Sequence, residues 1–271
     1  MDQEALVKLT KDLKASVSKM TRDEARFLVD SYYQMQNDRL RASAQIRSAD
    51  QDENGEPHEI LDWLKTNSTA LENQIKSALG CWAESQPVGK WMMKIGGVGH
   101  VIAAGLLAHL DITKAPTVGH FWAFAGLDPS KKWEKKTKRP WNAALKTLVA
   151  FKLGECFVRL GDSKGSFYRE IFVQRKALEA GRNERLEYKD QAKAALEAKK
   201  YGKETDARKA YESGKLPPAH IHARARRYAV KLFLAHLHEV MYRDHYHKEP
   251  PLPYPIAMQN HAHKIEVEKA A

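Results

Sequence analysis

The chain has 271 residues, and 43% of them are hydrophobic, which is enough to bury a core and excludes a disordered protein. Lys and Arg number 45 against 34 Asp and Glu, so the formal net charge is +11 and the pI is near 9.4. This surplus favours a polyanionic partner, nucleic acid rather than membrane. No apolar stretch reaches the roughly 18–20 residues that span a bilayer, and residues 1–4 show no signal-peptide pattern. Cys81 and Cys156 lack metal-type spacing, which excludes a disulfide framework and favours the cytoplasm, with nucleoid association if the source is bacterial.

The charge is unevenly distributed along the chain. Residues 1–90 contain 12 basic and 15 acidic side chains, whereas the remainder contains 33 and 19. A mildly acidic segment repels phosphate, so the first third is predicted to be an assembly or scaffolding element. The basic surface is expected in the C-terminal two-thirds.

Two stretches within residues 1–86 have helical spacing and predict a helical hairpin. Thr21 and Glu24 have the spacing of a capping box, which starts a helix. The side chains that then recur at spacings of three and four are Ala25, Leu28, Tyr32, Met35, Arg39, Ala42 and Ile46. A second apolar stripe consists of Ile60, Leu64, Leu71, Ile75 and Trp82, and residues 50–57 form the turn between the two helices. The first seam packs either inside its own domain or against a second copy, as a homodimeric coiled coil.

A glycine-rich turn lies between two apolar stretches at residues 91–110. Glycine permits positive φ and close approach of the backbone, so Gly97, Val98 and Gly99 can direct N–H groups of the following helix toward a phosphate oxygen. Val98 would fill the space between the two helices. Such a contact is independent of base sequence. Tight helix packing or a helix C-cap would use the same residues, and that structural alternative stays open.

A strongly basic run follows this helix-hairpin-helix unit. Residues 116–129 predict another helix with its stop, and residues 130–139 then contain six Lys or Arg and one Trp. Trp133 and Trp141 are candidates for stacking on unpaired bases, or for burial. Pro140 suits the first turn of a further helix, which continues a buried face up to Gly161. Residues 87–162 are therefore predicted to be the nucleic-acid-binding core. Its glycines suit both tight helix packing and contact with phosphate.

The last third of the chain is charged. Residues 163–248 predict long exposed helices that project from the body, followed by a basic helix that starts at Pro217 and Pro218. Residues 249–271 form a tail that is Pro-rich, and therefore extended, and that contains histidine. The predicted fold is all-α: an N-terminal helical hairpin, a helix-hairpin-helix domain and projecting charged helices.

The central motifs resemble the C-terminal helix-hairpin-helix domain of the insertion sequence 110 type transposases and the Piv-type DNA invertases. That family's Ile-Pro-Gly-x-Gly turn is similar to residues 95–99, and its Ala-x-Leu-Leu helix to residues 104–107. Its Gly-Leu-x-Pro motif is similar to residues 126–129, and the basic stretch before its Asn-x-x-Leu-Arg helix to residues 138–146. The resemblance covers about residues 70–160 and implies interaction with DNA, and with a guide RNA.

The chain departs from that family in three respects. Family members begin with a strand-rich RNase-H-like domain carrying four metal-binding carboxylates, whereas residues 1–90 predict helices. The family's nucleophilic serine lies in a Ser-Gly-rich loop after Gly-Leu-x-Pro, where this chain has a short Lys-rich loop with Ser130 alone nearby. Ser130 is therefore a weak catalytic candidate that equally suits a helix cap. Gly96 replaces the usual Pro.

Eight of the 12 histidines form four His-x-His pairs: His220 and His222, His236 and His238, His245 and His247, His261 and His263. On a helix, residues two apart point in nearly opposite directions and do not share a metal ion easily. The pairs are therefore expected to line the basic surface and support phosphate contact. Neither a metal nor a cofactor is predicted.

The sequence leaves three functions open. The favoured one is a non-catalytic, sequence-independent DNA-binding protein related to the transposase C-terminal domain, acting on duplex or branched DNA or on structured RNA. The second is an enzyme, a divergent or truncated transposase or recombinase that needs a partner catalytic subunit or a guide RNA. The third is a self-assembling structural helical protein. The predicted nucleic-acid contacts are Gly97, Val98, Gly99, His100, Lys131, Lys132, Lys135, Lys136, Lys138, Arg139, Lys146, Arg224, Arg226 and Arg227.

Overall fold

The computed structural model describes residues 9–51, 58–161, 166–202, 204–253 and 265–267. Within these ranges every regular element is helical and no strand occurs, which confirms the all-α prediction. The chain divides into two compact units, one formed by residues 1–94 and 98–111 and the other by residues 95–97 and 112–271. Most of the predicted turn at residues 50–57 lies outside the described residues, as do His261 and His263. No helix in the described ranges is long and apolar enough to cross a membrane.

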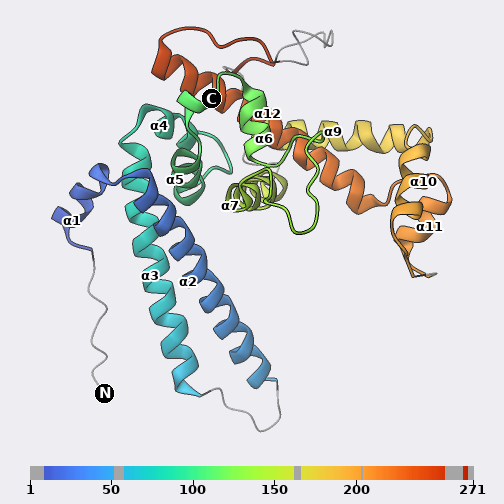
Figure 1. The fold of residues 1–271 in the computed structure, drawn as a ribbon. Helices are drawn as coiled ribbons and strands as arrows, with labels where there is room; N and C mark the ends of the chain where they lie inside the picture. Colours follow the sequence, from blue (N-terminus) through green and yellow to red (C-terminus); the bar gives the residue numbers. More distant parts are fainter. Residues whose placement is uncertain (1–8, 52–57, 162–165, 203, 254–264, 268–271) are drawn as a thin grey trace. The chain divides into compact units, whose positions relative to one another are not determined.

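The first unit is built around a long pair of helices (Figure 1). Its elements are α1 (Lys11–Ser16), η1 (Val17–Lys19), α2 (Arg22–Ala49), α3 (Glu59–Glu84), α4 (Pro87–Met93) and α5 (His100–His109). Helices α2 and α3 pack side by side, and α5 packs against both of them and against α4. The predicted capping box starts α2, because Thr21 N–H donates to Glu24 Oε2 at 2.7 Å and Glu24 N–H donates to Thr21 Oγ1 at 3.2 Å.

The predicted seam of α2 faces α3. Ala25 and Ala42 are buried, and the guanidinium of Arg39 bonds the Glu72 carboxylate, with an Nε–Oε2 distance of 2.6 Å. Gln36 donates a second hydrogen bond to the same carboxylate. The seam is therefore used inside its own unit, where the charge of Arg39 has an acidic partner.

The predicted second stripe, on α3, is wrong for three of its five residues, whereas its Trp82 is buried. Ile60, Leu64 and Leu71 are 54%, 39% and 36% exposed. Besides Trp82, the buried positions of α3 are Ser68, Glu72, Ala78, Leu79, Gly80 and Ala83. The buried face of α3 does not coincide with its most apolar residues. Arg39 and Gln36 of α2 bond Glu72, so the face of α3 that carries Glu72 packs against α2.

The second unit contains η2 (Ile112–Lys114), α6 (Val118–Phe124), α7 (Ala143–Lys146), the π-helix η3 (Thr147–Leu153), α8 (Gly154–Arg159), α9 (Phe167–Glu184), α10 (Lys189–Ala198), α11 (Asp206–Glu212) and α12 (Pro218–Tyr246). Elements α7, η3 and α8 follow one another without a break. The prediction that Pro140 lies in the first turn is wrong, because Asn142 is the N-cap and its side chain accepts the Leu145 N–H at 2.9 Å. Pro218 does begin α12, as predicted.

The charged helices of the second unit are anchored rather than free. Helix α9 runs along α12, and its Phe172 is buried with Ala225 and Ala229. Helices α10 and α11 pack on each other around a small core that contains Tyr188, Ala192, Tyr211, Leu216 and Ile221. These contacts use the few large apolar residues in a stretch that is otherwise exposed and charged.

The expectation that the histidine pairs line a basic surface is wrong for His236 and His238. Both side chains are 2% exposed. His236 Nδ1 lies 2.7 Å from the Tyr168 hydroxyl, and its Nε2 lies 2.8 Å from the carbonyl of Ile265, while His238 Nε2 lies 2.8 Å from the carbonyl of Ala115. Both rings therefore form hydrogen bonds with buried polar groups. Because the two histidines are two residues apart on the helix, they point in different directions and reach different partners.

Candidate nucleic-acid interface

The glycine turn between α4 and α5 is fixed by packing at its centre. Gly97 has φ +91, and a Cβ atom there would lie 3.0 Å from Leu160 Cδ1 and 3.1 Å from Phe157 Cδ1. Val98 is 5% exposed. Gly97 therefore has a structural reason to be glycine, because both its positive φ and its close neighbours disfavour a side chain.

Gly99 has a different environment. It is the N-cap of α5, with extended backbone and no side-chain cap, and a Cβ atom there would meet nothing within 4 Å. Gly99 is exposed, whereas residues 101–108 of α5 are all buried. The ring of His100 lies against Gly80, and its Nε2 is 3.9 Å from Glu84 Oε1. The exposed end of α5 therefore presents backbone N–H groups that no side chain caps.

The basic loop, residues 128–142, is held in shape by its own hydrogen bonds. Asn142 N–H donates to the Phe124 carbonyl at 2.9 Å and closes the base of the loop. Thr137 accepts the Trp133 indole N–H at 2.8 Å, and Lys136 has φ +68, a left-handed conformation that is uncommon for lysine. The predicted cations of the loop, which are Lys131, Lys132, Lys135, Lys136, Lys138 and Arg139, are all exposed.

Ser130 lies in a turn at the start of this loop and caps no helix. Its N–H and its hydroxyl both donate to Asp128 Oδ1, at 2.9 and 2.8 Å. These two bonds, together with nearby lysine charge, lower the pKa of Asp128 below its ordinary value. A carboxylate of lowered pKa is a poor base for activating the serine. The catalytic suggestion for Ser130 stays a prediction, and its role as a helix cap is wrong.

Gly126 connects α6 to the basic loop that follows it. Its φ is +64, and a Cβ atom there would lie 2.8 Å from Lys146 Cδ and 2.9 Å from Trp141 Cγ. The Lys146 ammonium lies over the Trp141 ring, 4.0 Å from its centroid. A glycine at this position therefore lets Trp141 and Lys146 pack across the end of α6.

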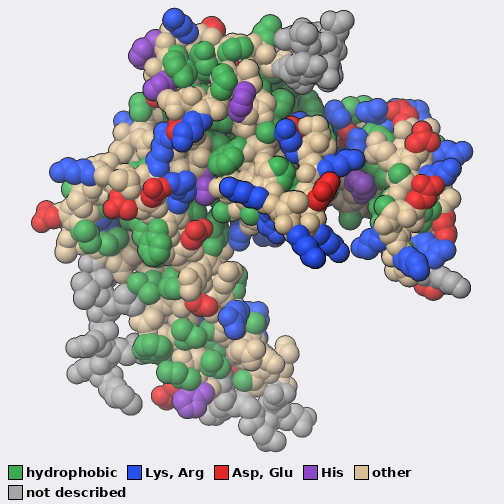
Figure 2. Space-filling view, in the orientation of Figure 1, with side chains coloured by type: hydrophobic (Ala, Val, Ile, Leu, Met, Phe, Trp, Pro, Cys, Tyr) green, Lys and Arg blue, Asp and Glu red, His purple; other side chains and the backbone are tan. Residues whose placement is uncertain are grey.

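Three cations from separate segments come together in the second unit. We call Arg139, Lys146 and Arg227 the basic cluster. Partial burial lowers the pKa of Lys146, and the charges of Arg139 and Arg227 lower it further. None of the three forms an ion pair with a carboxylate of the described residues, so the cluster is a concentration of positive charge that water and solute ions must neutralise. Figure 2 shows Lys and Arg side chains gathered over this part of the second unit.

The basic cluster continues along α12. His220, Arg224, Arg227 and Lys231 follow one another at spacings of three and four, which places them on one face of the helix. Burial and the charges of Arg227 and Arg224 lower the pKa of His220. Lys231 lies 4.2 Å from the centroid of the Trp122 ring. His220 was expected on the basic surface from its His-x-His pair, whereas Lys231 was not among the predicted contacts, although its spacing to Arg224 and Arg227 is readable in the sequence.

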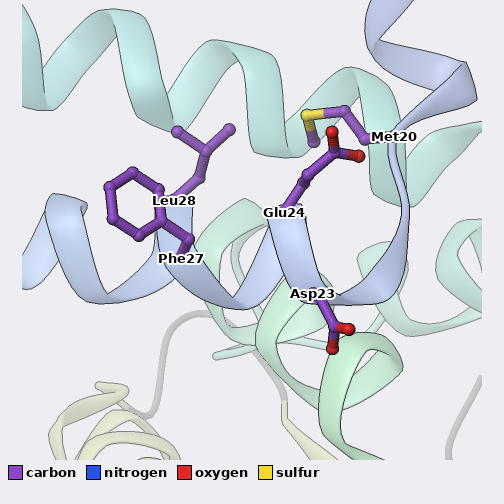
Figure 3. A pocket seen from close by; sticks show the side chains of 5 residues that line it. All are labelled: Met20, Asp23, Glu24, Phe27 and Leu28. Atoms are coloured by element: carbon purple, nitrogen blue, oxygen red, sulfur yellow. The ribbon is translucent and has the colours of Figure 1, made fainter.

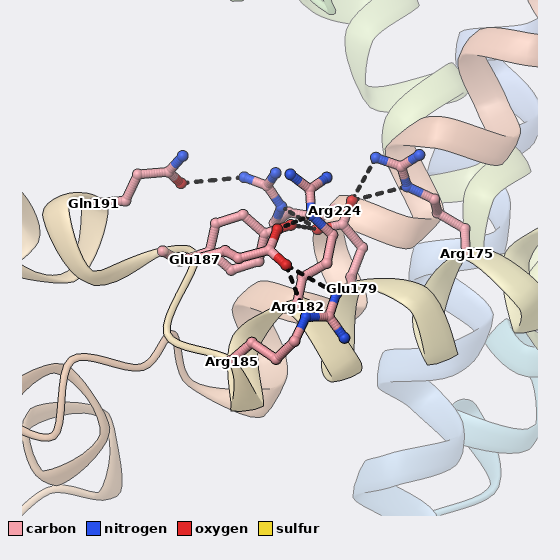
Figure 4. Close-up of polar contacts among 8 residues, drawn as sticks. Arg175, Glu179, Arg182, Arg185, Glu187, Gln191 and Arg224 are labelled. Carbon is pink, nitrogen blue, oxygen red and sulfur yellow. Dashed lines mark hydrogen bonds and ion pairs between the residues drawn. The ribbon is translucent and has the colours of Figure 1, made fainter.

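Two of the predicted contacts on α12 are already paired with carboxylates. Arg224 bonds Glu179 at 2.8 Å and Gln191 at 3.2 Å, and Arg226 bonds Glu155. Figure 4 shows Arg224 turned toward Glu179, which Arg175 contacts from the other side. Arg227 follows Arg226 directly in the sequence, and it is exposed without a carboxylate partner among the described residues. The structure therefore distinguishes Arg227 from its neighbours.

A shallow hollow on the first unit is poorly suited to phosphate. It has a volume of about 430 Å³ and is lined by Met20, Asp23, Glu24, Phe27 and Leu28 (Figure 3). Its polar groups are the two carboxylates, and Glu24 already accepts the hydrogen bonds of the capping box. Among the described residues there is also no group of three His, Cys, Asp or Glu side chains placed to hold a metal ion.

The hairpin glycines, Gly126 and the basic loop all fall within one stretch of sequence. Residues 89–140 match the model of the transposase IS116/IS110/IS902 family. The match confirms the resemblance carried by residues 95–99 and 126–139. It covers about a fifth of the chain, from the middle of α4 to the end of the basic loop. No curated protein and no solved structure matches the chain.

The transposase-family segment thus includes most, but not all, of the predicted contacts. It contains Gly97, Gly99, Trp133 and Arg139, while Lys146 and Arg227 lie beyond it and complete the basic cluster. The match supports a function related to transposition, and the matched family implies an interaction with DNA.

Proposed function

We propose that this transposase-related protein binds nucleic acid through its phosphates, without reading base sequence. The observation that carries the proposal is the basic cluster, in which the charges of Arg139 and Arg227 act on Lys146 and none of the three has a carboxylate partner among the described residues. Like charges held together cost folding free energy unless an anion compensates them. A phosphate backbone supplies that compensation at regular intervals and carries no base-specific information.

The proposal assigns two kinds of contact. The uncapped N-terminus of α5, beginning at Gly99, donates backbone N–H groups to a phosphate oxygen. The exposed cations of the basic loop and the basic cluster, all within the second unit, neutralise phosphates. DNA is the partner that the family match favours, and a duplex and a branched junction satisfy these contacts equally.

The test is a fluorescence anisotropy titration with duplex DNA, a four-way junction and a structured RNA at several salt concentrations. Binding should weaken steeply with salt and differ little between duplexes of unrelated sequence. A variant with Lys135, Lys136, Lys138 and Arg139 changed to Gln should lower the slope of log affinity against log salt by up to about 3.6, since each phosphate contact contributes about 0.9. An affinity that does not change with salt would contradict the proposal.

A second candidate is a recombinase that acts with a partner catalytic subunit or a guide RNA. The family match favours it, because that family's name is that of an enzyme. On this reading the isolated chain neither nicks nor rejoins DNA in the presence of Mg²⁺ or Mn²⁺. Cleavage by the purified protein that disappears in Ser130→Ala would make the chain itself the enzyme.

A third candidate function is self-assembly, which the exposed face of α3 favours. Ile60, Trp63, Leu64 and Leu71 are 36–54% exposed and recur at helical spacing. The acidic hairpin repels phosphate, so a second copy of the same apolar face is the partner that fits it. The homodimer predicted from the sequence would then use this face, because the seam of α2 is already covered by α3.

A further inference from the structure

Trp133 stands apart from the other tryptophans of the basic region. Its side chain is 41% exposed, and its ring is held in place at two points. The indole N–H donates to the Thr137 carbonyl at 2.8 Å, and the guanidinium of Arg139 lies over the ring, 5.1 Å from its centroid. The ring is therefore held in the loop without being buried in the core.

The neighbouring tryptophans lack this combination. Trp141 is partly buried under Lys146, and Trp122 under Lys231 with its indole N–H donating to the Lys231 carbonyl at 3.0 Å. Trp63 is more exposed than Trp133, but it lies in the acidic α3. Among the tryptophans of the described residues, Trp133 is thus the one that is both exposed and located in a basic loop.

An exposed aromatic ring in a lysine-rich loop, with an arginine over it, has a specific chemical use. In a continuous duplex the faces of the bases are covered by their neighbours, so an indole can stack only on a base that has left the helix. The lysines around Trp133 would neutralise the phosphates on either side of that base. Arg139, which lies over the ring, helps to hold the indole and supports stacking on the face that it leaves open through its positive charge.

We propose that Trp133 is a stacking platform for an unpaired nucleobase, so that the protein prefers branched or looped nucleic acid to a continuous duplex. This inference rests on the proposed phosphate binding and adds a preference that phosphate contacts alone do not give. The ligand is an unpaired base flanked by phosphates, in DNA or in RNA.

The test compares a DNA duplex carrying one bulged 2-aminopurine with the same duplex in which that base is paired, and repeats both in RNA. The full-length protein should bind the bulged forms about tenfold more tightly, and the 2-aminopurine emission should change on binding. Trp133→Leu should lower affinity for the bulged forms to that of the paired duplex and remove the emission change. Trp133→Phe should retain most of the preference, because a smaller aromatic face still stacks.

Phe27→Leu is the control, since it removes an exposed aromatic side chain from the first unit and should leave all affinities unchanged. Equal binding of bulged and paired duplexes by the wild type would overturn the stacking platform while leaving phosphate binding intact. An equal loss for both ligands in Trp133→Leu would also overturn it, because the residue would then act through the shape of the loop. Wild-type protein that binds none of these ligands would overturn both proposals. A difference between the DNA and RNA arms identifies which sugar the platform favours.

Discussion

Replacing Gly99 by aspartate separates the stability of α5 from the binding of phosphate at its N-terminus. The extended backbone at Gly99 suits any residue, and a Cβ atom there meets open space, so the side chain fits. Aspartate is among the best N-cap residues, because its carboxylate accepts a first-turn N–H and interacts favourably with the helix dipole. The same carboxylate occupies the donors assigned to phosphate and places a negative charge beside them.

The two effects have opposite signs and different sizes. Capping and the dipole together should stabilise the fold by about 0.5–1 kcal/mol, which raises Tm by about 1–4 °C for a chain of this size. Two like charges about 5 Å apart repel by about 3 kcal/mol at an effective dielectric constant near 20, so affinity should fall by up to about 100-fold at low salt. Higher salt should shrink this loss, because the charges are exposed.

A thermal melt and an anisotropy titration on the same preparation measure both quantities. Gly99→Asn is the uncharged partner variant: it caps the helix similarly and should lose less affinity than Gly99→Asp. Gln86→Asp adds the same charge at the N-cap of α4, which also lacks a side-chain cap, and should leave affinity nearly unchanged. If Gly99→Asp is folded, is at least as stable as the wild type and binds as tightly, the hairpin is purely structural.

Three further predictions concern other sites. Gly126→Ala should lower Tm and affinity together, because the positive φ costs about 1 kcal/mol and the new Cβ displaces Lys146; loss of neither quantity would contradict the role of Gly126. Burial would raise the pKa of Glu179, but hydrogen bonds from Tyr188, Arg224 and Arg175 outweigh it and lower the pKa to about 2. Glu179 therefore contributes on the order of 3 kcal/mol to the free energy of unfolding above pH 4.5, and this contribution is lost as pH falls toward 2. Denaturant titrations at several pH values should show that the free energy of unfolding of Glu179→Gln depends less on acid than that of the wild type. Changing Leu64 and Leu71 to Lys should convert a dimer to a monomer by light scattering with unchanged helical circular dichroism, and a monomeric wild type at micromolar concentration would rule out the α3 interface.

The sequence predicted best those features whose physics is local. The capping box at Thr21 depends on residues three apart, and the start of α12 depends on Pro218, so neither needs a tertiary partner. The α3 stripe failed for the opposite reason. Which face of α3 is buried depends on Arg39 and Gln36 of another helix, and hydrophobic periodicity alone does not report it.

The candidate site was predicted in part. The family motifs located the hairpin glycines and the basic loop, because both lie in one continuous segment. The basic cluster joins that loop to α7 and α12, and sequence spacing carries no information about contacts over such separations. The same limit explains the histidines: His236 and His238 belong to the core through Tyr168 and Ala115, residues far away in the chain.

Helix α12 shows why counting basic residues was insufficient. Arg224 and Arg226 both pair with carboxylates of other helices, and truncating either partner of such a pair leaves a charge uncompensated. Their charge stabilises the fold and is largely unavailable to a ligand. Arg227 and Lys146 have no such partner among the described residues, and the charge of Arg227 helps to lower the pKa of Lys146, so their repulsion opposes folding. Helix α12 thus neutralises two of its arginines and leaves Arg227 beside Arg139 and Lys146. An anion would relieve the repulsion among these three cations. The phosphates of a nucleic acid are the anions that the transposase-family segment is expected to meet.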